Sequence, residues 1–68
     1  MIKNIVEEID YVAKKHIKKI TEAPGELTDR QRNFYGSNTW TSELSSDSEV
    51  TLTNSTTGKA YKIVVSEV

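Results

Sequence analysis

The chain has 68 residues, of which 35% are hydrophobic and 28% are charged, with a formal net charge of -1 and no cysteine. Such a short chain can enclose only one hydrophobic core, so we expect residues 1–68 to form a single domain. The charge gives no support for long-range attraction to nucleic acid or to an anionic membrane. Without cysteine, neither a disulfide nor a thiolate zinc site can stabilise the fold.

No apolar stretch approaches the roughly 20 residues that are needed to span a bilayer. The first one is interrupted by the acidic residues Glu7 and Glu8, and no segment has the form of an export signal. We therefore expect a cytoplasmic protein, located in the host cytoplasm if a phage encodes it.

The first third of the chain has the pattern of an amphipathic helix over residues 2–22. Apolar residues recur at spacings of three and four, and charged residues lie opposite them. The apolar stripe consists of Ile2, Ile5, Val6, Ile9, Val12, Ala13, Ile17 and Ile20. The opposite, solvent-facing side consists of Lys3, Glu7, Glu8, Asp10, Lys14, Lys15, Lys18 and Lys19. Pro24 and Gly25 predict that the helix ends near Glu22.

Residues 23–37 are predicted to form a linker. Thr28, followed three residues later by Gln31, has the form of a capping box, and Gly36 is typical of a helix end. We therefore expect one short helical turn in this linker, and the sequence leaves its conformation otherwise open.

Beyond residue 37 the hydrophobic period changes to two, and Val, Thr and aromatic residues become frequent. This pattern predicts strands at residues 38–44, 49–54 and 59–65, separated by polar turns. The predicted fold is therefore α+β, with one long N-terminal helix packed on a three-stranded antiparallel β-meander.

The register of the second hairpin follows from burial. Pairing Leu52 with Tyr61, and Val50 with Ile63, places four apolar side chains on one face. A shift by one residue would turn Tyr61 and Ile63 outward and cost roughly 1.5–3 kcal/mol for each lost burial. We expect the helix to cover this face, which consists of Trp40, Leu44, Val50, Leu52, Tyr61, Ile63 and Val65. The other face is predicted to be polar and to lie in water.

The sequence contains no recognisable catalytic or cofactor motif. His16 is the only histidine and lies within the apolar stripe, so we expect a half-buried imidazole that is hydrogen-bonded to a strand or loop. Gly58-Lys59 resembles the end of a phosphate-binding loop, but Thr53 and Ala60 occupy the positions that require Gly and Ser or Thr. We expect no catalytic residue, no metal, no cofactor and no enzymatic activity.

Two features predict contact with another molecule. Tyr11 lies outside the apolar stripe among charged residues, and tyrosine side chains are common anchors of interfaces. The candidate partner-binding residues are Tyr11, Lys14, Lys15, Lys18, Arg30, Arg32, Phe34 and Tyr35. The last strand is predicted to be a sheet edge, which offers a route to a homodimer with Lys62 and Val64 at the contact.

These features favour a small non-enzymatic module that binds a larger protein or nucleoprotein and regulates or inhibits it. In size and composition, without a shared motif, the chain resembles small phage-encoded inhibitors of bacterial host or defence machinery, including anti-CRISPR proteins. The alternative is an RNA- or DNA-binding accessory protein, in which Arg30, Arg32 and the helix lysines contact phosphates. The negative net charge disfavours this alternative. The target and the choice between monomer and dimer stay open at this stage.

Overall fold

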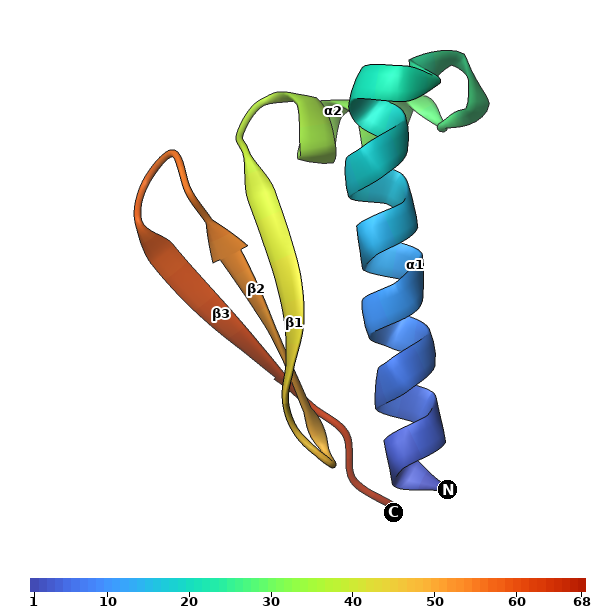
Figure 1. The fold of residues 1–68 in the computed structure, drawn as a ribbon, viewed down its shortest axis with the longest axis vertical. Helices are drawn as coiled ribbons and strands as arrows, with labels where there is room; N and C mark the ends of the chain where they lie inside the picture. The colour runs from blue at the N-terminus through green and yellow to red at the C-terminus, as the bar shows by residue number, and fades with distance from the viewer.

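A long helix lies along one side of a three-stranded sheet (Figure 1). In the computed structural model, which describes residues 1–68, helix α1 spans Ile2–Glu22, as predicted. The strands are β1 (Trp40–Ser46), β2 (Glu49–Asn54) and β3 (Lys59–Val64), and they form an antiparallel sheet in the order β1-β2-β3. The predicted α+β fold with a meander is confirmed.

The linker contains more helix than predicted. A 3-10 turn, η1, spans Pro24–Glu26, and helix α2 spans Asp29–Gly36, which is eight residues rather than a single turn. The predicted capping box is present, because the Gln31 backbone N–H donates to Thr28 Oγ1 at 3.2 Å and the Thr28 backbone N–H donates to Gln31 Oε1 at 2.8 Å. These two bonds satisfy N–H groups that the first turn of a helix leaves free, so α2 begins at a defined residue.

The strand bounds differ from the prediction mainly in β1, which begins and ends two residues later than expected. A bulge between Leu44 and Ser46 lets pairing continue as far as Ser46, opposite Glu49. The predicted bounds left residues 45–48 as the turn, and this is wrong, because only Asp47 and Ser48 lie between the strands. β2 has the predicted bounds, and β3 ends one residue early.

The predicted register of the second hairpin is confirmed, with Leu52 opposite Tyr61 and Val50 opposite Ile63. Its turn is closed by Gly58, which has a φ of 79° and donates its backbone N–H to the Asn54 carbonyl at 2.8 Å. Only glycine adopts this left-handed conformation without a steric cost, so the residue type fits the turn.

Helix α1 contacts the sheet through a strip that differs from its apolar stripe. Its buried residues are Val6, Asp10 and Ala13, whereas Ile5 and Val12 are 41% and 36% exposed. The helix packs on β1 and, to a smaller extent, on β2, and it leaves β3 almost uncovered (Figure 1). The expectation that the helix would cover the whole apolar face is therefore wrong for Tyr61 and Leu44, which are 51% and 43% exposed.

The position of Asp10 contradicts the prediction that it lies on the solvent side. Its carboxylate is buried and accepts a hydrogen bond of 2.7 Å from the Ser42 hydroxyl, and Lys14 Nζ lies 2.8 Å from it. A buried carboxylate is tolerated when donors and an opposite charge compensate for its lost hydration. The periodicity of α1 could not reveal this, because the compensating hydroxyl belongs to β1.

Candidate functional site

An open groove lies between α1, α2 and the sheet, because α1 leaves β3 uncovered. Its volume is about 520 Å³, and all three parts of the fold contribute to its walls. The apolar lining consists of Ile9, Val12, Ala13, Phe34, Tyr35, Leu52 and Ile63. We refer to this feature as the apolar groove.

Several of the apolar side chains in and beside the groove are exposed to solvent. Val12 and Phe34, which line it, are 36% and 46% exposed. Ile5 follows the same side of α1 as Ile9, and Tyr61 shares a face of β3 with Ile63, so both extend the apolar surface. Large contiguous apolar surfaces on a folded protein indicate contact with another molecule.

The polar lining of the groove consists of Glu8, His16, Arg30 and Gln31. His16 is half-buried, as predicted, but it contacts α2 rather than a strand or loop, since its Nε2 lies 3.5 Å from Gln31 Nε2. The His16 ring also meets the Tyr35 ring edge-on at 5.6 Å between centroids. Neither Glu8 nor Arg30 takes part in any of the ion pairs of the structure.

An aromatic cluster fixes α2 against the sheet at one end of the groove. The rings of Phe34 and Trp40 are stacked at 4.8 Å with an interplanar angle of 14°, and Trp40 Nε1 donates to the Phe34 carbonyl at 3.2 Å. Tyr35 meets Phe34 edge-on at 4.8 Å, and Tyr61 lies 6.0 Å from Trp40. Burial raises the pKa of Tyr35 above its usual 10.0, which agrees with its place inside this cluster.

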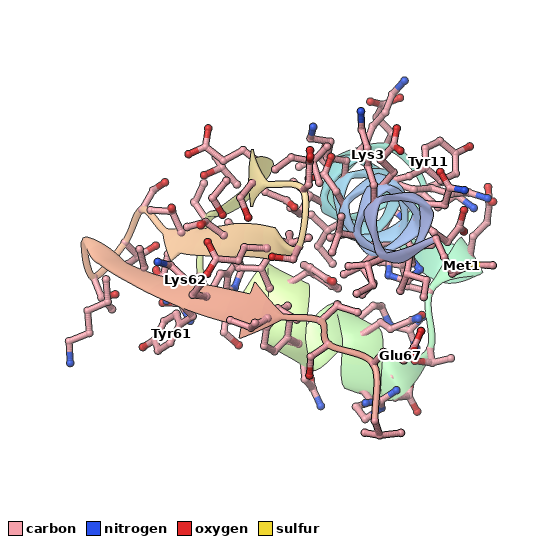
Figure 2. The ribbon with its side chains drawn as sticks, turned by 90° about the horizontal axis from the view of Figure 1, so that it is seen from below. Met1, Lys3, Tyr11, Tyr61, Lys62 and Glu67 are labelled. Carbon is pink, nitrogen blue, oxygen red and sulfur yellow. The ribbon has the colours of Figure 1, made fainter.

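The structure divides seven of the eight candidate partner-binding residues between two surfaces, and Arg32 lies on neither. Arg30, Phe34 and Tyr35 line the apolar groove. Tyr11, by contrast, is 61% exposed and points away from the sheet (Figure 2). It shares this outer side of α1 with Lys14, Lys15 and Lys18, which are also exposed. We call Tyr11, Lys14, Lys15 and Lys18 the outer face of α1.

Two of the predicted basic contacts are engaged within the fold. Arg32 donates to the carbonyl oxygens of Pro24 and Leu27 and pairs with Asp29, so its guanidinium holds the linker together. Lys14 pairs with the carboxylate of Asp10. These partners reduce the positive charge that is free to bind phosphate.

The two residues predicted for self-association lie away from the groove. Lys62 pairs with Glu49 across the strands at 3.9 Å, and Val64 is 61% exposed. Figure 2 shows that Tyr61 and Lys62 leave β3 on opposite sides. Because side chains alternate along a strand, Lys62 and Val64 lie on the polar face, opposite the face that carries Ile63.

The groove was not predicted from the sequence, because its lining residues Ile9, Val12, Leu52 and Ile63 were all expected in the core. A signal was available, since the apolar stripe of α1 contains eight residues spread widely around the helix. Each residue advances by about 100° around a helix, so a stripe this broad covers more than one contact face. One small sheet therefore cannot bury all of it.

The described residues place no three His, Asp or Glu side chains where they could hold a metal ion together. None of the helices combines the length and the apolar character that a membrane-spanning segment requires. In comparisons with known proteins, no family model, no curated protein and no solved structure matches the chain.

Proposed function

We propose that the chain is a small non-enzymatic protein-binding module and that the apolar groove is its docking surface. The observation that carries the proposal is that α1, α2 and β3 expose apolar side chains toward one groove. Burial of these side chains would favour a complex by roughly 25 cal/mol for each Å² of apolar surface removed from water, before the entropic cost of association is subtracted.

The shape of the groove favours a protein over a small molecule. Small-molecule sites usually enclose most of the ligand and direct several polar groups toward it. Here the walls stay open, since Val12 and Phe34 remain 36% and 46% exposed. His16 and Gln31, two of the polar lining residues, already lie against each other. An apolar protein surface would fill this space better than a compact ligand.

The outer face of α1 supplies a second surface for a larger partner. Tyr11 is exposed there beside Lys15 and Lys18, and a partner in the groove would leave all three accessible. Exposed tyrosine side chains with neighbouring cations are frequent in protein interfaces. We propose that this surface binds a larger protein or nucleoprotein, and that the binding regulates or inhibits that partner, as predicted from the sequence.

The alternative function in nucleic-acid binding is less well supported by the arrangement of charges. Arg32 and Lys14, two of the cations on which that alternative depends, have partners within the fold. Among the residues that line the groove, Arg30 is the only Lys or Arg. Since phosphate contacts dominate the affinity for nucleic acid, a groove with a single cation favours a protein partner. Lys15 and Lys18, on the outer face of α1, take part in none of the ion pairs and are cations that the alternative would still use.

The test is a pull-down with the tagged chain from a bacterial lysate that also contains an untagged copy, with and without nuclease. Val12→Glu places a charge in the groove, whereas Ser55→Glu places the same charge in the exposed β2–β3 turn, outside both the groove and the outer face of α1. We expect a protein that survives nuclease treatment, is lost with Val12→Glu and is retained with Ser55→Glu.

Three results would contradict the proposal. Equal capture by Val12→Glu and the wild type would exclude the groove as the docking surface. Partners that disappear with nuclease, or with moderate salt, would favour the nucleic-acid alternative. Capture of no protein, including the untagged copy, would exclude a protein-binding module.

A further inference from the structure

The chain exposes more surface than a folded monomer of its mass usually does. Its accessible surface is 4831 Å² at 7.7 kDa. The scaling of surface with mass gives about 4,300 Å² for a compact monomer of this size, so the excess is about 500 Å². The radius of gyration, 12.5 Å, also exceeds the value of about 11 Å expected for this length.

The core that remains is small. Only 7 of 68 residues are buried, and the buried apolar residues are Val6, Ala13, Leu27 and Val50. Chains shorter than roughly 70–80 residues need a disulfide, a metal, an unusually efficient core or a second copy. This chain has no cysteine, and apolar side chains line a groove that stays open to solvent. The apolar burial that the core lacks would have to come from a partner that always accompanies the chain.

The apolar side chains of the groove come from two walls, which a contact between identical surfaces can use. In a two-fold interface the same patch occurs on both subunits. Ile9 and Val12 lie on the α1 wall, which Ile5 extends, and Leu52 and Ile63 lie on the sheet wall, so the α1 wall of one copy can pack on the sheet wall of the other.

The charges of the groove also suit an identical partner. Glu8 lies on α1 and Arg30 on α2, and neither has an ion-pair partner within the fold. A second copy brings one carboxylate and one guanidinium of its own, so both signs of charge can be compensated across the contact.

We propose that the occupant of the apolar groove is a second copy of this chain, arranged as a two-fold dimer. This inference rests on the proposed function and names the partner. A specific interface needs about 1,000 Å² of buried surface in total, or about 500 Å² on each copy, which is similar to the excess surface of the whole chain. The expected dimer is therefore modest in affinity, with a Kd on the order of micromolar.

This dimer differs from the one predicted from the sequence, in which two copies of β3 pair edge to edge through Lys62 and Val64. Edge pairing would form hydrogen bonds between backbones but would leave Ile5 and Val12 exposed. The groove dimer covers these side chains, and the outer face of α1 stays free on both copies. A substitution in the groove therefore distinguishes the two dimers.

The experiment is sedimentation equilibrium of the purified full chain alone, from roughly 1 µM to 1 mM. The wild type should approach twice the monomer mass as the concentration rises. Val12→Glu should raise the Kd at least tenfold, and Tyr11→Glu should leave it within about twofold, since Tyr11 lies outside the groove. Ile5→Glu is a second variant at a position that is 41% exposed, in case Val12→Glu does not fold, and circular dichroism checks both.

A wild type that stays monomeric at every concentration would overturn the inference. Dimerisation of Val12→Glu and Ile5→Glu as strong as that of the wild type would overturn it too, and would point to the β3 edge. Neither result would contradict the proposed function, because the lysate pull-down can still recover a different protein whose binding requires Val12.

Discussion

The Ser42 hydroxyl donates a 2.7 Å hydrogen bond to Oδ1 of Asp10 and so joins the middle of α1 to β1 in the interior of the protein. Both residues are buried, and Lys14 Nζ reaches the other carboxylate oxygen at 2.8 Å. Asp10 must therefore face β1. This orientation turns Ile9 and Val12 toward the groove. The hydrogen bond between Asp10 and Ser42 therefore helps to set how α1 is rotated about its axis, and this rotation leaves the groove open.

We predict that Asp10 and Ser42 are energetically coupled. Asp10→Ala and Ser42→Ala should each lower the free energy of unfolding by about 1–3 kcal/mol, because each leaves a buried polar group without its partner. The double variant should cost about 1 kcal/mol less than the sum of the two single changes. Urea unfolding at one fixed protein concentration measures all four proteins. Additive losses would mean that the hydrogen bond does not contribute to stability.

We expect the protein to lose stability in acid through Asp10. Burial by itself raises the pKa of this carboxyl, but the hydrogen bonds from Lys14 and Ser42, with the charge of Lys14, outweigh burial and hold the pKa below its usual 3.8. The unfolded chain therefore binds this proton at a higher pH than the folded chain. The stabilisation is present above about pH 4 and is lost as the pH falls through the lower folded pKa.

The measurement for this prediction is the free energy of unfolding of the wild type and of Asp10→Asn between pH 6 and pH 2. Their difference should be largest near pH 6 and should shrink below about pH 4. Asp47→Asn, in the exposed β1–β2 turn, is the control for removal of one negative charge. If the difference in the free energy of unfolding between the wild type and Asp10→Asn stays constant with pH, Asp10 is not the source of the acid sensitivity.

The capping box of α2, the helix that forms one wall of the apolar groove, should stabilise the fold. Thr28→Ala removes the acceptor of the Gln31 backbone N–H and should cost about 1 kcal/mol of stability. Thr28→Ser keeps the acceptor and should restore most of the loss. Urea unfolding compares the two variants, and an equal loss in both would mean that the cap is unimportant.

Val50 and Leu44 are paired across β1 and β2, yet their burial differs sharply. Val50 is fully buried at 0% exposure, whereas Leu44 is 43% exposed. Val50→Ala should therefore lower the free energy of unfolding by about 2 kcal/mol, and Leu44→Ala by less than about 1 kcal/mol. Thermal or urea unfolding checks the ranking, and a larger loss at Leu44 would show that α1 or a second copy covers this position.

Local patterns in the sequence were sufficient for the elements themselves. The spacing of Ile and Val residues determined α1, Thr28 and Gln31 indicated the start of α2, and the burial of alternate apolar residues determined the register of the second hairpin. These features depend on neighbours within a few residues, or on one turn, so their physical causes are visible in the sequence. The three-stranded meander follows from them, since short turns join antiparallel neighbours.

The rotation of α1 on the sheet was decided only by the tertiary structure. From its spacing alone, Asp10 belongs to the charged side of the helix, and Ile5 and Val12 belong to the core. The Ser42 hydroxyl reverses these assignments, because it comes from a strand 32 residues away and makes burial of one carboxylate favourable. Helical periodicity contains no information about that donor. The exposed apolar side of α1, and with it the groove, therefore arises from a contact between distant residues.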